Sequence, residues 1–280
     1  MSIPSNFKKW IAGFSAIGGA MLFYPNDNNH NQSLEKQHSW ITPPSFWGKW
    51  DHNWDRRHPE WLANVAITNN ETNKESRKKR SIKNKMNVKH HIILIRHGQY
   101  NTDGKTDLDK TLTNLGKEQA NATGKRLQEL GLPYSLLIHS TMTRAQETAK
   151  IIEKYLKNVT VKENSVLSEG LPIPPEPSIN IWEPEIHFYE DGPRIEAAFR
   201  KYFHRPESIQ ETDSYVILVC HANVIRYFVC RALQFPPEGW LRLRLNHGSI
   251  TWISIRPNGR VTLRSLGDSG YMKPQLISSY

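Results

Sequence analysis

Three short runs of branched and aromatic residues each end abruptly in polar side chains, and this pattern constrains the fold more than any other feature of the chain. Residues 92–96 lead into His97, residues 134–139 lead into a polar turn, and residues 215–220 lead into His221. A helical stretch follows each run. Regular alternation of strand and helix predicts an α/β protein, a three-layer α/β/α sandwich around a mainly parallel central sheet.

Helix and turn signals predict most of the remaining elements. Thr113 suits the amino-terminal cap of a helix that Gly131 ends, and Pro193 suits the first turn of another helix. A Pro-Asn-Gly turn at 257–259 joins two β-prone segments into a terminal hairpin. The predicted helices cover residues 114–130, 142–157, 193–204 and 223–233, and the predicted hairpin strands cover 249–255 and 260–265.

Cationic and imidazole side chains gather at one edge of the predicted sheet. The carboxyl ends of parallel strands meet there, and ligands of open α/β sheets bind at that edge. Arg96 and His97 end the first strand, His221 ends the third, and Arg144 lies in the first turn of the helix after the second. A cation opposes the helix dipole at that position, which hints at a bound anion. These residue types suit a phosphate that arginine holds while an imidazole nitrogen attacks it.

Each of these residues also has a purely structural interpretation. A strand-end histidine is often a packing residue, and Arg144 could be a solvated surface arginine. Glu169 precedes a proline-rich loop and is a candidate general acid, but from spacing alone a solvated loop glutamate is the simpler interpretation. Two imidazoles, each at a strand end before a polar turn, are harder to explain by packing alone.

Four motifs, taken in their order along the chain, resemble one family, the histidine phosphatase (phosphoglycerate mutase-like) superfamily. They are Ile-Arg-His-Gly at 95–98, Leu-Thr-Asn-Leu-Gly-Lys-Glu-Gln-Ala at 112–120, Ser-Thr-Met-Thr-Arg-Ala at 140–145 and Cys-His-Ala at 220–222. The similarity continues through most of residues 88–273. Ala-Leu-Gln-Phe-Pro-Pro-Glu-Gly-Trp at 232–240 narrows it to the mitochondrial serine/threonine protein phosphatase branch of that superfamily.

The resemblance implies a role for each candidate residue. His97 is the nucleophile that becomes transiently phosphorylated, and Arg96, Arg144 and His221 bind the phosphoryl oxygens. Glu169 gives a proton to the leaving alkoxide and takes one from the hydrolytic water. His97 must present one unprotonated nitrogen, so we expect a backbone carbonyl to hold the other. Since no metal-ligand spacing is evident, we expect neither a metal nor another cofactor.

One position departs from the family pattern. Asp103 stands where many members carry an asparagine that touches phosphate. A carboxylate inside the pocket would repel phosphate, so we expect Asp103 to point elsewhere.

The implied activity is that of a serine/threonine protein phosphatase whose substrates are phosphoserine and phosphothreonine proteins. A small-molecule phosphoglycerate mutase or phosphatase is one alternative. A non-catalytic mitochondrial scaffold is the other, although the complete set of five candidate residues disfavours it.

Residues 1–24 are expected to form a membrane anchor and mitochondrial targeting segment. Lys8 and Lys9 precede an apolar run over 10–24, which is shorter than the roughly 17–25 residues of an ordinary membrane span. A cleaved secretory signal is the alternative, but bulky residues end the run where small ones would mark a cleavage site. The resemblance implies a mitochondrial location, with the outer membrane favoured over the inner.

Residues 25–87 are expected to be a linker that carries a tryptophan-rich segment at 46–57. Aromatic and arginine side chains dominate interface hot spots, whereas a membrane-interface belt is less attractive roughly 25 residues beyond the anchor. The resemblance implies that this segment drives self-association into dimers and higher oligomers and activates the enzyme. The motif residues are Trp50, Asp51, Asn53, Trp54 and Asp55.

Positive charge is concentrated in the run 74–89, where eight lysines and arginines face one glutamate. The chain as a whole has a formal net charge of +10. Such a run suits a solvated linker, an anionic lipid surface or an acidic partner. A nucleic-acid role is not expected, because neither aromatic interleaving nor a nucleic-acid-binding fold accompanies the charge.

The catalytic domain is therefore expected over 88–273, followed by a short tail over 274–280. A domain of that length can bury a hydrophobic core large enough for stable folding. Cys220 ends a predicted strand and Cys230 lies in the next predicted helix, so we expect no disulfide between them.

Overall fold

A six-stranded sheet organises the protein around the strand that ends at Arg96. The computed structural model describes residues 49–57, 87–178, 185–207 and 209–279. Within these ranges the strand order is β3-β2-β4-β1-β5-β6. The strands are β1 (His90–Arg96), β2 (Tyr134–His139), β3 (Thr160–Glu163), β4 (Ser214–Cys220), β5 (Ile250–Ile255) and β6 (Val261–Asp268).

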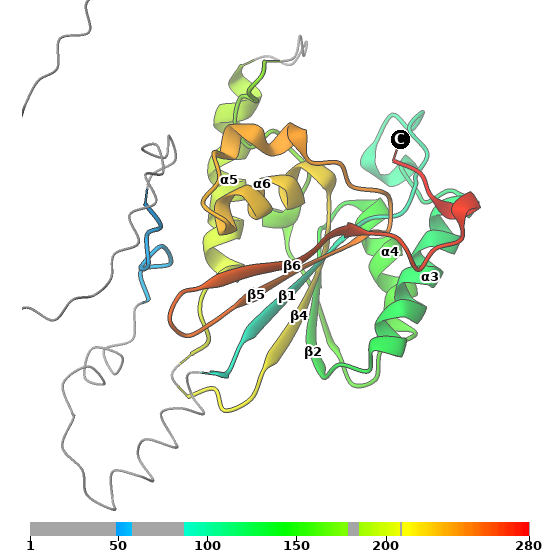
Figure 1. Cartoon of the computed structure of the whole chain (residues 1–280). Coiled ribbons are helices and arrows are strands. Elements are labelled where there is room, and N and C mark those ends of the chain that lie inside the picture. The colour runs from blue at the N-terminus through cyan, green and yellow to red at the C-terminus, as the bar shows by residue number, and fades with distance from the viewer. Residues whose placement is uncertain (1–48, 58–86, 179–184, 208, 280) are drawn as a thin grey trace, which may run out of the picture. The chain divides into compact units, whose positions relative to one another are not determined.

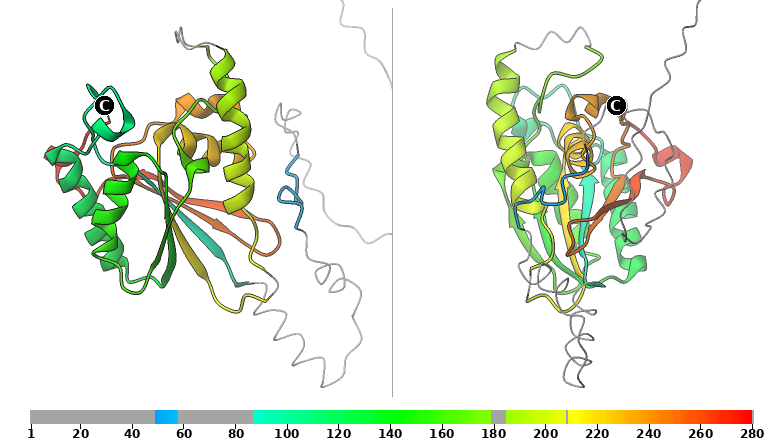
Figure 2. Two further views of the ribbon diagram at one scale, coloured as in Figure 1. Left: turned by 180° about the vertical axis from the view of Figure 1, so that it is seen from behind. Right: turned by 60° about the vertical axis from the view of Figure 1, so that its left-hand side comes forward.

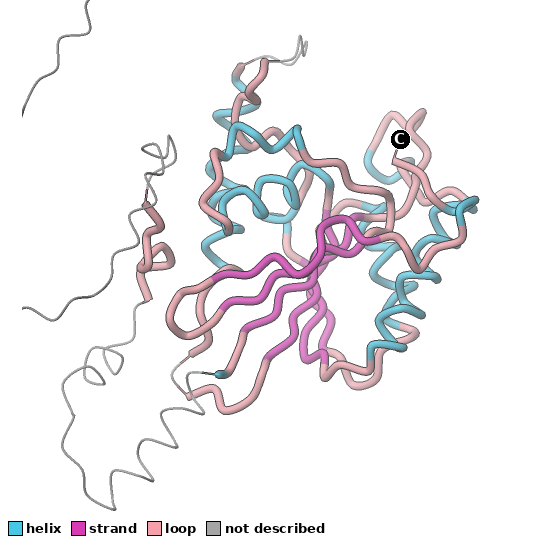
Figure 3. The backbone as a smooth tube through the Cα atoms, viewed as in Figure 1, coloured by secondary structure: helices cyan, strands magenta, loops and turns pink. Residues whose placement is uncertain are grey.

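The sheet is parallel over four strands and antiparallel at the hairpin. β1 pairs with β4, β4 with β2 and β2 with β3 in parallel, whereas β5 runs antiparallel to β1 and β6. Figures 1 and 3 show the hairpin strands continuing the sheet beside β1. The predicted α/β class with a mainly parallel sheet is confirmed, and the carboxyl ends of β1, β2 and β4 share one edge.

Four α-helices within the described ranges cover the two faces of this sheet. Figures 1 and 2 show α3 and α4 on one face and α5 and α6 on the other, which gives the three predicted layers. The helices are α3 (Asn114–Leu130), α4 (Thr143–Glu153), α5 (Ile186–Tyr202) and α6 (Ala222–Ala232).

The side chains of β1 alternate between two buried clusters. Ile93 and Ile95 pack in a cluster that includes Leu127 of α3. Ile92 and Leu94 pack on the other face with residues of α5 and α6. A strand that is buried on both faces must be apolar throughout, and each of these side chains stabilises the fold by roughly 1.5–3 kcal/mol when fully buried.

α3 begins and ends where its capping signals predicted. The side chain of Thr113 accepts a hydrogen bond from the Gly116 amide at 3.0 Å. Gly131 ends the helix with a φ of 59°, in the left-handed region that favours glycine. The loop that follows β1 packs against this helix start, so the cap helps to position the end of β1.

Two expectations about secondary structure were wrong. α5 begins at Ile186, so Pro193 lies inside the helix rather than in its first turn. An interior proline removes one helical hydrogen bond, but Asp191 and Arg194 beside it make tertiary contacts that hold this turn. The edge strand β3 was not expected, because its four residues are mostly polar and exposed.

The predicted membrane anchor lies outside the described residues, and so does most of the predicted linker. Within the described ranges, no helix combines the length and the apolar character that a membrane span requires. The anchor at 1–24 therefore stays a prediction from the sequence.

Both cysteines are free thiols inside the α5/α6 side of the protein. Cys220 is the last residue of β4 and Cys230 lies in α6, and both are buried. Burial raises the pKa of the Cys220 thiol well above its usual range, and it raises the pKa of Cys230 to about 11. At neutral pH both side chains are therefore protonated packing groups.

His90 at the start of β1 should make the protein less stable in acid. The imidazole is 7 % exposed, and its Nδ1 lies 2.8 Å from Ser214 Oγ. Burial, aided by the charge of neighbouring His204, lowers the pKa of His90 to about 4. An unfolded histidine has a pKa of about 6.5, so between these values the unfolded chain binds more protons. The free energy of unfolding should therefore fall by about 2 kcal/mol from this residue between pH 7 and pH 5.

Urea unfolding at both pH values would measure this loss, with His90→Gln as a side chain that cannot titrate. The variant should lose about 2 kcal/mol less than the parent over the same interval. Equal losses in the two proteins would exclude His90 as the source.

Candidate active site

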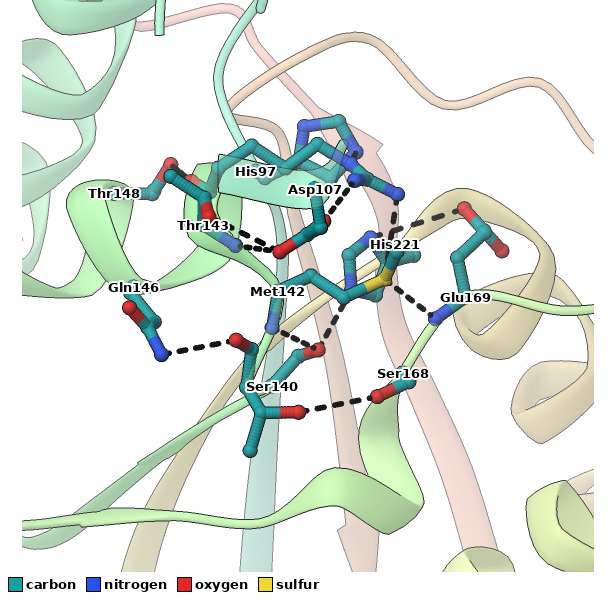
Figure 4. Close-up of polar contacts among 12 residues, drawn as sticks. His97, Asp107, Ser140, Met142, Thr143, Gln146, Thr148, Ser168, Glu169 and His221 are labelled. Atoms are coloured by element: carbon teal, nitrogen blue, oxygen red, sulfur yellow. Dashed lines mark hydrogen bonds and ion pairs between the residues drawn. The ribbon is translucent and has the colours of Figure 1, made fainter. Parts of the chain in front are cut away.

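The predicted site residues come together at the carboxyl edge of the parallel strands. His97 directly follows β1, His221 directly follows β4 at the start of α6, and Arg144 is the second residue of α4. The ring centroids of His97 and His221 are 5.1 Å apart. Figure 4 shows Glu169 reaching toward His221 from a neighbouring loop.

Hydrogen bonds fix which nitrogen of His97 can act as a nucleophile. Nδ1 lies 2.8 Å from the carbonyl oxygen of Gly98. A carbonyl oxygen only accepts, so Nδ1 carries the hydrogen and Nε2 keeps its lone pair. Nε2 accepts a hydrogen bond from Nε of Arg144 at 3.3 Å. The expected carbonyl partner is therefore that of Gly98, and the nucleophilic nitrogen faces a guanidinium group.

A close approach of two backbone segments holds the loop after His97. The Gly98 amide donates to Thr148 Oγ1 of α4 at 3.0 Å. A Cβ atom at Gly98 or at Gly116 would collide with the backbone of the facing segment. Glycine at both positions lets the loop lie directly on the start of α3, which restricts the position of the imidazole.

One ring nitrogen of His221 makes a hydrogen bond, and the other makes none with the described residues. Its Nε2 shares a hydrogen bond with Ser140 Oγ at 2.9 Å, and Ser140 Oγ also accepts from the Met142 amide at 3.2 Å. Its Nδ1 is buried and has no hydrogen-bond partner among the described residues. The nearest carboxylate oxygen, Oε2 of Glu169, is 3.9 Å away. Nδ1 is therefore able to contact an oxygen of a bound group.

Arg144 lies between His97 and a carboxylate that the sequence did not suggest. Its Nη1 is 3.4 Å from Oδ1 of Asp107. The other carboxylate oxygen accepts from the Thr143 amide at 2.9 Å and from Thr143 Oγ1 at 3.0 Å. Asp107 thus sits on the amino terminus of α4, where the helix dipole favours negative charge. Figure 4 shows it beside Thr143.

Arg96 is close enough to His97, Glu169 and His221 for its charge to influence all three, and part of its guanidinium is bonded to main-chain carbonyls. Its Nη1 donates to the carbonyl oxygens of Leu245 at 2.6 Å and Ser279 at 3.1 Å. A third imidazole, that of His247, lies with its ring centroid 5.7 Å from that of His97. Asp103 is exposed and accepts from Thr102 Oγ1, away from the imidazole cluster, as its charge predicted.

Burial and positive neighbours set the protonation states of the site. Burial, followed by the charges of His221, Arg144 and Arg96, holds the pKa of His97 well below its usual range. Burial and the same arginines lower the pKa of His221. Burial raises the pKa of Glu169, although Arg144 and Arg96 oppose this. A neutral imidazole beside a carboxyl group that can hold a proton suits nucleophilic attack with general acid catalysis.

The same groups also form a potential metal-ligand set. His97, Glu169 and His221 each offer a donor atom, and these atoms lie within 4.8 Å of one another. Two histidines and a glutamate are a familiar set of zinc ligands. The guanidinium groups of Arg96 and Arg144 beside them oppose a divalent cation and attract an anion. This charge balance fits a phosphoryl group better than a metal ion.

Three neighbours of the site were missed by sequence reasoning. Ser140 had a usable signal, because it directly follows β2 within the same motif as Arg144. Asp107 lies in a polar loop and His247 in an irregular segment before β5, and neither has a local pattern that marks it. Only the packing of distant segments places these two side chains beside His97 and Arg144.

The tryptophan-rich segment contacts the catalytic domain through its predicted motif residues. Trp54 Nε1 donates to the carbonyl oxygen of Gly259 at 2.8 Å, and its ring centroid lies 5.9 Å from that of Phe199 in α5. The Asp51 amide donates to the side-chain oxygen of Gln234 at 2.8 Å. Most of the residues that this segment contacts lie far from it along the chain, so the sequence alone could not predict these contacts.

A buried ion pair anchors the same segment. Asp55 and Arg205 have side chains that are each 1 % exposed, and their closest charged atoms are 2.7 Å apart. Burial alone would raise the pKa of Asp55, but the hydrogen bonds and charge of Arg205 outweigh it and lower that pKa. Arg205 also donates to the carbonyl oxygen of His52 at 2.8 Å. Trp50 makes no hydrogen bond or ring contact of this kind with another residue of the described ranges.

The catalytic domain matches the model of one known protein family. The family model of the histidine phosphatase superfamily (branch 1) matches residues 92–170 and 182–268. The chain belongs to the histidine phosphatase superfamily. This confirms the family predicted from the four motifs, and the matched residues include each strand end that contributes to the site.

Two relatives are more than half identical to this histidine phosphatase over the aligned residues. The mitochondrial serine/threonine-protein phosphatase PGAM5 of Xenopus laevis is 56 % identical over 238 residues, which cover 85 % of this chain and 86 % of the relative. Its counterpart in Drosophila pseudoobscura pseudoobscura is 54 % identical over 273 residues, 95 % of this chain and 94 % of the relative. The predicted similarity to this branch is confirmed.

Solved structures support the fold of this histidine phosphatase. YhfR of Bacillus stearothermophilus superposes with a TM-score of 0.52 and 19 % identity, over 65 % of this chain and 98 % of the other. At this identity the similarity concerns the fold alone.

Proposed function

We propose that this chain is a membrane-anchored mitochondrial serine/threonine protein phosphatase that acts through a phosphohistidine at His97 and is activated by multimerisation. The observation that carries the catalytic part is the lone pair of His97 Nε2, left free by the bond from Nδ1 to the Gly98 carbonyl. That nitrogen faces Arg144. Relatives at 54–56 % identity are named mitochondrial serine/threonine-protein phosphatases.

In the first half of the proposed reaction, His97 Nε2 attacks the phosphorus of a phosphoserine or phosphothreonine ester. A nitrogen–phosphorus bond forms, and the bond from phosphorus to the alkyl oxygen breaks. Glu169 in its protonated form gives its proton to the departing alkoxide. Arg96, Arg144 and His221 hold the phosphoryl oxygens and spread their charge.

In the second half, water attacks phosphohistidine. Glu169, now a carboxylate, takes a proton from the water as the nitrogen–phosphorus bond breaks. Inorganic phosphate leaves, and His97 returns to its neutral form with the hydrogen on Nδ1. Glu169 is protonated again, so the cycle closes without a further reagent.

The anchor and the location rest on the sequence and the relatives. The apolar run at 10–24 follows a basic flank, and the relatives that match most of the chain carry the word mitochondrial in their names. We place the catalytic domain over 88–273, the linker over 25–87 and the tail over 274–280, with the outer membrane favoured over the inner.

Activation by multimerisation is the part that involves the tryptophan-rich segment. Trp54 packs near Phe199, and Asp55 pairs with Arg205 just after α5. α5 also contacts the loop that carries Glu169. A change in how this segment docks could therefore alter the catalytic loop through a single helix.

Phosphate release from a phosphothreonine peptide by the full chain in detergent tests this function. We expect steady release by the parent, and at least about tenfold less by a Trp50→Ala/Trp54→Ala double variant that sediments as smaller species. Trp47→Ala, in the same segment but outside the motif, should behave as the parent.

Two other results would contradict the proposal. Turnover of 3-phosphoglycerate with no release from the peptide would indicate a metabolic mutase. Silence on both substrates would indicate a scaffold.

Removal of divalent metal should leave the peptide activity unchanged. The arginines beside His97, Glu169 and His221 supply the positive charge that a metal would otherwise contribute. Phosphate release after dialysis against a chelator, compared with a sample dialysed against buffer alone, measures this. A loss that added Zn²⁺ restores would show that the three donor atoms hold a catalytic ion.

A further inference from the structure

Arg194 of α5 fastens the main chain of the loop that carries Glu169. Its Nη1 donates to the carbonyl oxygens of Ser168 at 2.6 Å and Val166 at 3.3 Å, and its Nη2 donates to that of Glu169 at 3.1 Å. One guanidinium group thus binds three carbonyls within four residues. Bonds from the rigid, planar fork of arginine restrict both the position and the direction of the loop.

Asp191, one helical turn earlier, completes this clamp. Its Oδ1 accepts from Arg194 Nη2 at 2.5 Å, and its Oδ2 accepts from the Leu171 amide at 3.0 Å. The pair therefore holds the loop on both sides of Glu169. A side chain at Gly170 would collide with both members of the pair, so the loop lies directly against them.

The carboxyl group of Glu169 has little other support. Its Oε1 accepts from the Asn223 amide at 3.2 Å, and its Oε2 is 3.9 Å from His221 Nδ1. Its side chain is 25 % exposed, so packing alone does not fix it. The place of the carboxyl group therefore depends mainly on where the main chain is held.

We propose that Arg194, together with Asp191, is a positioning residue that keeps Glu169 in reach of the leaving-group oxygen. This inference rests on the proposed role of Glu169 as the general acid. A displacement of about 1 Å in a catalytic group can cost about 10²-fold in rate. The clamp should therefore matter most for substrates whose leaving group needs a proton.

Two substrates separate this role from a general structural one. The alkoxide of a phosphothreonine peptide leaves poorly without a proton, whereas the phenolate of p-nitrophenyl phosphate leaves well without one. Loss of the general acid should lower kcat/KM for the first substrate and largely spare kcat/KM for the second, because kcat/KM reports phosphoryl transfer to His97 and not the later hydrolysis step that both substrates share. A variant that merely damages the fold should slow both.

The experiment measures kcat and KM of the full chain for both substrates. The variants are Arg194→Gln, Arg194→Lys and Asp191→Asn, with Glu169→Gln as the reference for a lost general acid. Arg200→Gln is the matched control, because Arg200 lies on the same helix, is 61 % exposed and pairs with Glu196 instead of the loop.

We expect Arg194→Gln to lower kcat/KM for the peptide by roughly 30- to 100-fold and for p-nitrophenyl phosphate by less than about threefold. Arg194→Lys should be impaired in the same selective way, because an ammonium group cannot span three carbonyls. Asp191→Asn should show a smaller loss of activity that is again selective for the peptide. This variant tests the inference if the arginine variants fold poorly. Arg200→Gln should match the parent.

The outcomes distinguish the inference from the function on which it rests. If Glu169→Gln selectively loses activity on the peptide and the variants of Arg194 and Asp191 do not, the inference alone is overturned. If the Arg194 variants lose activity on both substrates equally, the clamp is structural and the inference is again overturned. If Glu169→Gln shows no selectivity, Glu169 is not the general acid, and both the proposed mechanism and the inference fall.

Discussion

His97→Ala should lower phosphate release from a phosphothreonine peptide by roughly 10⁴-fold or more. The substitution removes the imidazole whose hydrogen bonds leave Nε2 unprotonated and facing Arg144, so the proposed route through a phosphorylated His97 is lost. Release of inorganic phosphate measures the loss. Rapid quenching of the parent with labelled peptide should also trap an acid-labile phosphoprotein, which the variant should not form.

A second histidine offers a matched control. His139 ends β2 and makes the same kind of bond, from Nδ1 to the carbonyl oxygen of Ser140 at 2.9 Å. His139→Ala should therefore disturb local packing to a similar extent and retain most of the activity. Phosphate release that survives in His97→Ala, or an equal collapse in His139→Ala, would remove His97 from the mechanism.

The second large effect concerns stability rather than catalysis. Asp55→Ala should lower the free energy of unfolding by about 3–5 kcal/mol, because it leaves the guanidinium of Arg205 buried without its carboxylate. Urea denaturation of the full chain measures the change. Asp51→Ala is the control, since its pair with Arg56 spans 3.5 Å at the surface and should contribute at most about 1 kcal/mol.

A double variant tests whether the unpaired charge is the cause. Asp55→Ala combined with Arg205→Leu removes both partners, and it should cost less than Asp55→Ala alone. If the two variants are equally destabilised, the lost stability comes from packing of the segment and not from a stranded cation.

The strand ends of this protein could be predicted because they follow from local pattern and topology. The apolar run 92–95, buried on both faces, identifies a central strand, and the parallel arrangement brings His97 and His221 to one edge. Arg144 follows from the same logic, since α4 starts at that edge. The motifs then named the family, which no pattern of hydrophobicity could do.

Other parts of the site depend on contacts between distant segments. Glu169 lies in an irregular loop whose course is set by Arg194, which is far away in sequence and sits in a helix whose start was mispredicted. The predicted start of this helix at Pro193 was wrong because tertiary contacts at Asp191 and Arg194 outweigh the preference of proline for the first turn of a helix. The partner of Asp55, Arg205, is separated from it by 150 residues, and no local rule connects them.

The proposed nucleophile has a consequence for the sensitivity of the enzyme to oxidants. Phosphatases that attack through a thiolate are silenced when peroxide converts that thiolate to a sulfenic acid. In the proposed mechanism the attacking atom is an imidazole nitrogen, and the thiols of Cys220 and Cys230 are buried and protonated. Dephosphorylation by this protein should therefore continue under oxidant stress that stops thiol-based enzymes, so that this activity persists where theirs is lost.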